Sequence, residues 1–136
     1  MASFTQYGLE DLIQSFERLA NIPDEVIDGM LNAGADVIAE KQKQVGRRMG
    51  VHKTGVTLES IVKSPKTGKA VAGRYIDIYP KGVNADGNRN AEVAFINEFG
   101  KRGQLARPFM QTANEEAAQE ATDAAAKVLY DWQENQ

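Results

Sequence analysis

The sequence has no cysteine and only one histidine, His52. The lack of cysteine excludes disulfide bonds and thiolate metal sites. A Ser-His-Asp triad would have to use His52, which lies in a stretch rich in Lys and Arg. No Gly-Lys-Ser/Thr motif of a phosphate-binding loop is present, and the fragment around Asp86 lacks the glutamate that a calcium loop requires. We therefore expect no enzyme activity, no metal site and no cofactor.

Long apolar runs are also missing from the sequence. None approaches the roughly 20 residues that a membrane-spanning helix needs, and the N-terminus lacks the charged-then-apolar pattern of a secretion signal. At 136 residues the chain is long enough for one hydrophobic core but not for two. We expect one soluble domain over residues 1–136, made in the cytoplasm.

The net charge is only −3, yet charges of opposite sign are separated along the chain. Residues 41–107 contain fourteen Lys or Arg and five Asp or Glu, whereas the two flanks contain two basic and fourteen acidic residues. This separation indicates either a surface for nucleic acid or self-association, in which the basic middle of one copy meets the acidic helices of another. Solvated faces of a single folded domain would give the same pattern.

Three stretches have the apolar spacing of amphipathic helices. The first begins near Gly8. The second runs from Pro23 to Val45, with acidic residues in its first turn, where the helix dipole favours them. The third begins at Pro108 and has an alanine-rich stripe, which predicts close packing against another element along its length. The apolar face of the first helix consists of Leu9, Leu12, Ile13, Phe16 and Leu19.

The middle of the chain has the pattern of short strands and polar loops. Ile61 and Val62 indicate the end of a strand, and the alternation in residues 74–79 predicts a second strand after a turn at 66–69. Residues 46–57 and 82–90 are rich in Gly and polar side chains, and we expect both segments to be mobile. Within the second segment, the Asn-Ala-Asp-Gly sequence that starts at Asn84 favours a turn. The chain should therefore have an α+β fold, with two N-terminal helices and a long C-terminal helix packed on a small, mainly antiparallel β-sheet.

The pattern of residues 91–112 predicts a joint between two packed elements. The three-residue spacing of Val93, Ile96 and Phe99 favours a helix over a strand, and a glycine that can take the left-handed conformation follows it. A proline at the first position of the next helix costs no hydrogen bond. We expect Glu98 to form a structural ion pair with the nearby Lys101, Arg102 and Arg107. The predicted joint consists of Glu98, Phe99, Gly100, Pro108 and Phe109.

Two stretches of the sequence carry a resemblance to a known family. Residues 95–100, FINEFG, followed by 106–110, ARPFM, resemble the signature of a family of tailed-phage structural proteins. These are minor tail, neck and tail-completion components of phages with long non-contractile tails. Residues 53–61, KTGVTLESI, are similar to the Thr-Gly, Leu, Ser-Ile segment of that family. The chain departs from the family at Lys101, where Thr is usual, and by one extra residue between Gly55 and Leu58.

The resemblance implies a structural virion protein that forms a homo-oligomeric ring, a hexamer in the virion, at the head-to-tail joint. Its partners would be further copies, head-closure or connector proteins, and tail terminator or tail-tube proteins, with passing contact with DNA and none with a membrane. It would be assembled in the cytoplasm of the bacterial host and reside in the neck or tail. The loop at 82–90 would reach a neighbouring subunit or the central channel. The candidate interface residues are Arg47, Arg48, Lys53, Lys101, Arg102, Gln104 and Arg107.

The alternative hypothesis is a small nucleic-acid-binding module that uses the basic central region. Its phosphate-binding residues would be Arg47, Arg48, Lys53, Lys63, Lys66 and Lys69. An isoelectric point near 5.2 and the few aromatic residues available for base stacking argue against this function. No helix-turn-helix or zinc-binding pattern is present in the sequence.

Overall fold

The computed structural model describes residues 21–51, 55–71 and 73–135. The predicted α+β class is confirmed, and the long C-terminal helix is present. The predicted helix near Gly8 lies outside the described residues. In chain order the elements are α2 (Asp24–Arg48), α3 (Val56–Glu59), β1 (Ile61–Lys63), β2 (Gly68–Ala70), β3 (Gly73–Tyr75), β4 (Ile78–Pro80), α4 (Asn90–Phe99) and α5 (Phe109–Glu134).

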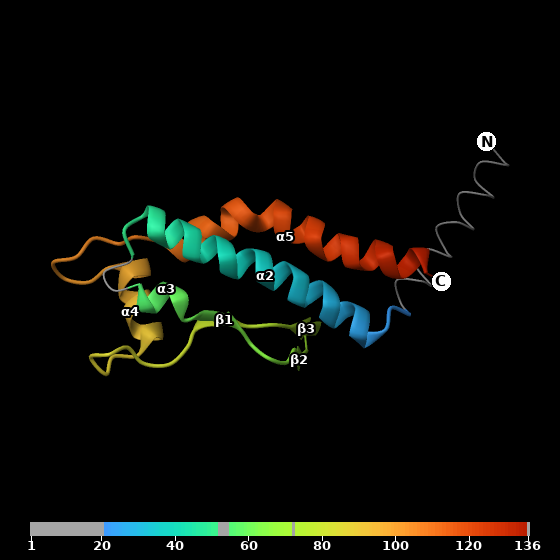
Figure 1. Cartoon of the computed structure of the whole chain (residues 1–136), viewed down its shortest axis with the longest axis horizontal. Helices are drawn as coiled ribbons and strands as arrows, with labels where there is room; N and C mark the ends of the chain where they lie inside the picture. The colour runs from blue at the N-terminus through green and yellow to red at the C-terminus, as the bar shows by residue number, and fades with distance from the viewer. Residues whose placement is uncertain (1–20, 52–54, 72, 136) are drawn as a thin grey trace.

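The two long helices, α2 and α5, lie side by side and run in opposite directions (Figure 1). Small residues allow this close approach. Ala113 and Ala117 on α5 are completely buried, and a Cβ atom on Gly34 of α2 would lie 3.5 Å from the carbonyl oxygen of Ala121. The alanine-rich stripe therefore packs against the second helix, as its small side chains predicted.

The second predicted helix is longer at its C-terminal end than expected. Pro23 precedes the first helical residue, and the helix continues through Gly46 to Arg48. Gly46 does not end the helix. Its lack of a side chain permits a close contact, since a Cβ atom there would lie only 2.3 Å from Cδ2 of Leu58. Pro108 similarly precedes α5 and is not its first residue.

The strands form two separate antiparallel pairs, so the expectation of a single sheet is corrected. β1 pairs with β4, with Ile61 opposite Pro80, and β2 pairs with β3. The prediction of one strand over residues 74–79 is wrong, because the chain changes partner there. The backbone carbonyl of Asp77 accepts a hydrogen bond from the backbone N–H of Ser64, 2.7 Å away, just beyond β1. The predicted turn at 66–69 is also wrong in part, since Gly68 and Lys69 belong to β2.

The hydrophobic core lies at one end of the helix pair, where α3, β1 and α4 meet the end of α2 and the start of α5 (Figure 1). Phe109, the first residue of α5, is completely buried at its centre. None of the described helices has the length and apolar character needed to cross a membrane. The buried core residues are Val45, Val51, Leu58, Ile61, Ala94, Phe109 and Ala113.

Both predicted mobile loops contain ordered contacts. In the first, residues 46–48 belong to α2, Val51 is buried and α3 begins at Val56, while residues 52–54 lie outside the described residues. In the second, the Asn84 side chain accepts hydrogen bonds from the backbone N–H groups of Asp86 and Asn88, each at 3.0 Å. The turn expected around Asn84 is present, and the mobility of the two loops stays a prediction.

Candidate functional site

The joint between α4 and α5 is organised by Glu98. Its side chain is buried, and its carboxylate accepts hydrogen bonds from the backbone N–H groups of Met110, at 3.0 Å, and Gln111, at 2.8 Å. These two groups lie in the first turn of α5, where N–H groups have no partner within the helix. Glu98 therefore caps α5 and places its negative charge at the positive end of the helix dipole.

The predicted ion pair between Glu98 and neighbouring basic side chains is wrong. Pro108 precedes α5 and makes no side-chain capping hydrogen bond, so the first N–H groups of the helix need an acceptor from elsewhere in the chain. Glu98 supplies this acceptor because the intervening segment turns back on itself. The sequence indicates the need for such a cap through the proline at the helix start, because a proline side chain cannot accept hydrogen bonds from the first N–H groups.

The turn after α4 is fixed by backbone contacts. Gly100 has a φ of 78°, and a Cβ atom there would lie 2.9 Å from both the amide nitrogen of Ala106 and the carbonyl oxygen of Gln104. Lys101 and Gln104 exchange backbone hydrogen bonds of 3.0 and 2.9 Å. The structure thus brings together Glu98, Gly100, Pro108 and Phe109 of the predicted joint.

The helix favoured for the stretch that ends at Phe99 is present as α4, but two of its apolar side chains are exposed and two of its polar residues are buried. Its buried residues are Asn90, Ala94 and Glu98, whereas Phe95 and Phe99 are 62% and 68% exposed. The buried Asn90 side chain accepts a hydrogen bond from Oγ1 of Thr57 at 3.3 Å and donates one to the carbonyl of Lys81 at 3.0 Å. The inner face of α4 is therefore held by specific polar contacts.

The outer face of α4 carries two phenylalanine rings in contact with each other. The ring centroids of Phe95 and Phe99 are 4.8 Å apart, and the rings are tilted by 48°. We call this pair the aromatic face. Single exposed apolar residues are common on protein surfaces, whereas adjoining exposed apolar side chains mark a candidate contact surface. Lys101 and Arg102, both exposed, follow the helix.

A cleft of about 660 Å³ lies beside α4 and the turn that follows it. Three of the predicted interface residues, Lys101, Gln104 and Arg107, line it, and the Arg107 side chain donates a hydrogen bond to the carbonyl of Gly50 at 3.1 Å. Carboxylates of Asp86 and Glu92 line it as well. The cleft is therefore lined by charged groups of both signs and by apolar side chains that include Val93 and Ile96.

The remaining predicted interface residues lie elsewhere. Arg47 and Arg48 belong to the last turn of α2, not to a loop, and they form ion pairs with Glu59 at 2.6 Å and with Glu116 at 2.8 Å. The hydrogen bond from Arg48 lowers the pKa of the Glu116 carboxyl. Lys53 lies outside the described residues.

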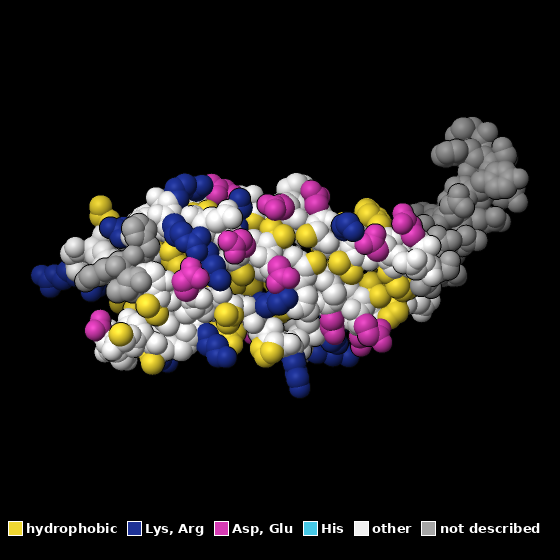
Figure 2. All heavy atoms as spheres, in the orientation of Figure 1, with side chains coloured by type: hydrophobic (Ala, Val, Ile, Leu, Met, Phe, Trp, Pro, Cys, Tyr) yellow, Lys and Arg dark blue, Asp and Glu magenta, His cyan; other side chains and the backbone are white. Residues whose placement is uncertain are grey.

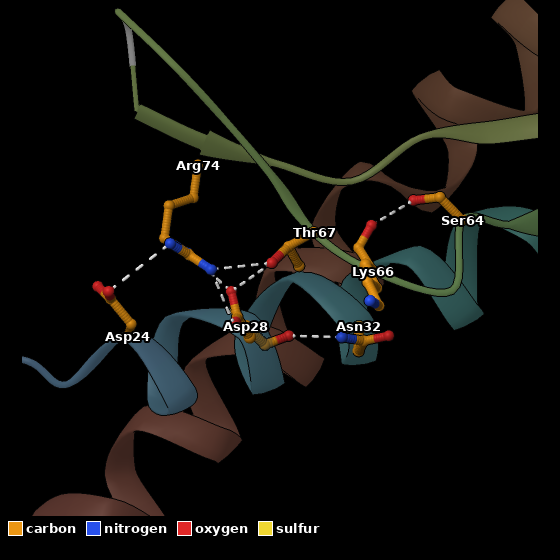
Figure 3. A network of polar contacts seen from close by, with 7 residues as sticks. All are labelled: Asp24, Asp28, Asn32, Ser64, Lys66, Thr67 and Arg74. Carbon is orange, nitrogen blue, oxygen red and sulfur yellow. Dashed lines mark hydrogen bonds and ion pairs between the residues drawn. The ribbon is translucent and has the colours of Figure 1, made fainter.

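A polar network that the sequence did not indicate joins the β2–β3 pair to α2 (Figure 3). Arg74 donates to both carboxylate oxygens of Asp28, at 2.8 and 3.0 Å, and Oγ1 of Thr67 donates to the same carboxylate at 2.7 Å. Arg74 also lies 3.7 Å from the carboxylate of Asp24. The hydrogen bond from Arg74, followed by that from Thr67, lowers the pKa of Asp28.

Basic residues of the middle segment thus pair with acidic residues of the flanks in the same chain. Besides the contacts of Arg48 and Arg74, Lys63 lies 2.8 Å from the carboxylate of Asp36 on α2. On the face seen in Figure 2, side chains of both signs lie close together over the helices. Part of the charge separation along the sequence is therefore neutralised by folding.

The described residues bring together no group of three His, Asp or Glu side chains that could hold a metal ion. The site is a surface composed of the aromatic face, the basic turn after it and the adjoining cleft. Comparisons with protein-family models, with curated protein sequences and with solved structures found no match to this chain.

Proposed function

We propose that this chain is a structural virion protein of a tailed phage or prophage, which forms a ring at the head-to-tail joint through which DNA passes. The aromatic face of α4 is the observation that carries the proposal, since it is a preformed apolar surface on a rigid support. The resemblance of residues 95–110 to minor tail, neck and tail-completion proteins supplies the place of assembly.

The two stretches that resemble the phage family pack together in the fold, which supports treating them as one signature. Leu58 and Ile61 come from the first stretch and Phe109 from the second, and all three belong to the same buried cluster. Thr57 of the first stretch also donates a hydrogen bond to Asn90, at the start of α4. The two segments are therefore parts of one folded unit that positions α4.

A ring subunit needs a surface for the next copy held at a fixed angle to its own body. The capping of α5 by Glu98 and the tight turn at Gly100 fix α4 relative to the helix pair. Buried aromatic residues commonly supply most of the binding energy at interfaces. Head-to-tail contacts between identical subunits close into a ring when the rotation between neighbours permits closure. Further surfaces would contact the head-closure or connector proteins and the tail terminator or tail-tube proteins.

The ion pairs of the basic middle argue against the nucleic-acid-binding alternative. Lys63 and Arg48, both candidates for phosphate contacts, are paired with carboxylates of the same chain. Each such pair reduces the positive charge available to bind phosphates. We therefore retain the structural function as the single proposal.

The test is a null mutant of the phage or prophage that encodes the chain. We expect DNA-filled heads and separate tails in electron micrographs, and joined particles after complementation with the wild-type chain. A Phe95→Ser/Phe99→Ser variant should fail to complement. A Tyr130→Ser variant, which changes a 60% exposed aromatic residue of α5, should complement.

Normal joining of heads and tails in the null mutant would contradict the proposal. So would a purified chain that stays monomeric and binds DNA tightly with a steep dependence on salt, because this behaviour is expected of the nucleic-acid-binding module.

A further inference from the structure

The aromatic face needs an apolar partner, and the surface next to it indicates the charge of that partner. Phe95 and Phe99 expose most of their rings, while the opposite side of α4 packs into the core. Two exposed basic residues, Lys101 and Arg102, follow at the end of the helix. In the described part of the chain neither of them forms an ion pair. A partner that is apolar on one side and acidic at its edge would complement this surface.

Residues 1–20 have this chemistry. Their apolar residues recur at helical spacing, as described for Leu9 through Leu19, and they contain three acidic residues against one basic residue, Arg18. A helix this short is marginal in water without a partner for its apolar side. The segment that precedes α2 is thus matched to the aromatic face in both hydrophobicity and charge.

The length of α2 separates the two parts within one chain. α2 has 25 residues and is therefore about 37 Å long. α4 lies near the C-terminal end of α2 (Figure 1), whereas residues 1–20 precede its N-terminal end in the sequence. Within one chain the segment could meet the aromatic face only by running back along most of α2, whereas a neighbouring copy can present its face directly.

We propose that residues 1–20 of one copy bind the aromatic face of the neighbouring copy. This inference rests on the self-association in the proposed function and names the contact between subunits. Each copy would contribute one segment and receive one, so the contact is head-to-tail. Repetition of such a contact gives a closed ring or an open filament.

The experiment uses two full-length variants and their mixture, measured by size-exclusion chromatography with light scattering. Leu12→Ser/Phe16→Ser removes the segment's apolar side, and Phe95→Ser/Phe99→Ser removes the aromatic face. We expect the wild-type chain to form oligomers with rising concentration and each variant alone to remain monomeric. An equimolar mixture should form a 1:1 dimer and nothing larger, because it retains one intact segment and one intact face per pair.

Tyr130→Ser is the matched control for loss of an exposed aromatic side chain, and it should assemble as the wild type does. Circular dichroism of each variant checks that the helices are retained. A monomeric wild type at every concentration, or a mixture that remains monomeric, would contradict the inference. Assembly of the segment variant like that of the wild type would also contradict it, yet would leave the ring proposal to be decided by the null mutant.

Cross-linking gives a second measurement that does not depend on weakening the contact. Because the sequence has no cysteine, a Ser15→Cys chain mixed with a Lys101→Cys chain can form a mixed disulfide only between copies. We expect a covalent heterodimer under mild oxidation. Ser15→Cys mixed with Asp131→Cys, on the far part of α5, should give much less. Equal yields from the two mixtures would overturn the inference.

Discussion

At the scale of one residue, the partners of Glu98 in the fold differ from those that its neighbours in the sequence predict. Its neighbours in sequence are basic, which favoured an ion pair. In the fold its two oxygens bind the N–H groups of Met110 and Gln111. The residue that precedes α5 is a proline, which makes no side-chain cap, so the start of this helix depends on a residue eleven positions before its first residue, Phe109.

We predict that Glu98→Ala lowers the free energy of unfolding by about 1–2 kcal/mol, since it removes a cap and leaves partly buried N–H groups without an acceptor. Urea unfolding followed by circular dichroism measures this change. Glu120→Ala, at an exposed position of the same helix, is the control and should change stability by less than about 0.5 kcal/mol. Equal effects of the two substitutions would argue against the capping role.

At the scale of elements, α2 and α5 depend on small residues for their close packing. Ala117 is completely buried in this contact, and Ala118, the next residue, is exposed. We predict that Ala117→Leu destabilises the chain by about 1–3 kcal/mol, because a buried site without free space does not accept three more carbon atoms without strain. Ala118→Leu should change stability by less than about 0.5 kcal/mol. Thermal or urea unfolding of both variants tests the pair, and similar losses would show that α5 is not packed through this stripe.

The attachment of the β2–β3 pair to α2 depends on the ionised carboxylate of Asp28. Its pKa is lower in the folded chain because Arg74 and Thr67 donate hydrogen bonds to the charged form. The unfolded chain then binds more protons than the folded chain does in acid, so this stabilisation is present above the ordinary Asp pKa of about 4. It is lost as the pH falls through the lower pKa of the folded state.

We therefore predict that Asp28→Asn reduces stability at neutral pH and flattens the decrease in stability below about pH 4. Unfolding curves over a pH series measure both effects. Asp131→Asn, which removes an exposed partner of Lys127, should leave the acid profile close to that of the wild type. If Asp28→Asn also kept the wild-type profile, the network in Figure 3 would not contribute to acid stability.

At the scale of the whole molecule, folding neutralises part of the charge that is separated along the sequence. Arg48, Lys63 and Arg74 pair with acidic residues of α2 and α5 within one chain. These side chains are already paired within each copy. The hypothesis that the basic middle of one copy meets the acidic helices of the next would need the same side chains for contacts between copies. Self-association through the aromatic face would depend on apolar contact and not on charge.

We predict that oligomers of the wild-type chain weaken but persist in about 1 M NaCl, where charges are screened over roughly 3 Å. Burial of Phe95 and Phe99 does not depend on charge, and excluded salts strengthen apolar contacts. Sedimentation velocity at low and high salt provides the measurement. Complete dissociation in high salt would favour the original charge-based hypothesis.

The sequence by itself determined the α+β class, the helices at 24–48, 90–99 and 109–134 to within a few residues, and the turn around Asn84. Local spacing and local turn chemistry are sufficient for these features. Only the tertiary structure decided which side of α4 is buried. The apolar spacing of Val93, Ile96 and Phe99 does not reveal that Asn90 and Glu98 find partners inside, since those partners lie in α3, the segment after β4 and the start of α5.

The partners of the charged residues were also decided by tertiary structure, for the same physical reason. An ion pair such as that between Arg74 and Asp28 joins positions 46 residues apart, and no periodicity in the sequence encodes which pairs form. The break between β3 and β4 has a similar origin, because it follows from a change of strand partner. Local pattern therefore specified the elements, whereas contacts between distant segments specified their orientation, their pairing and the surface left exposed.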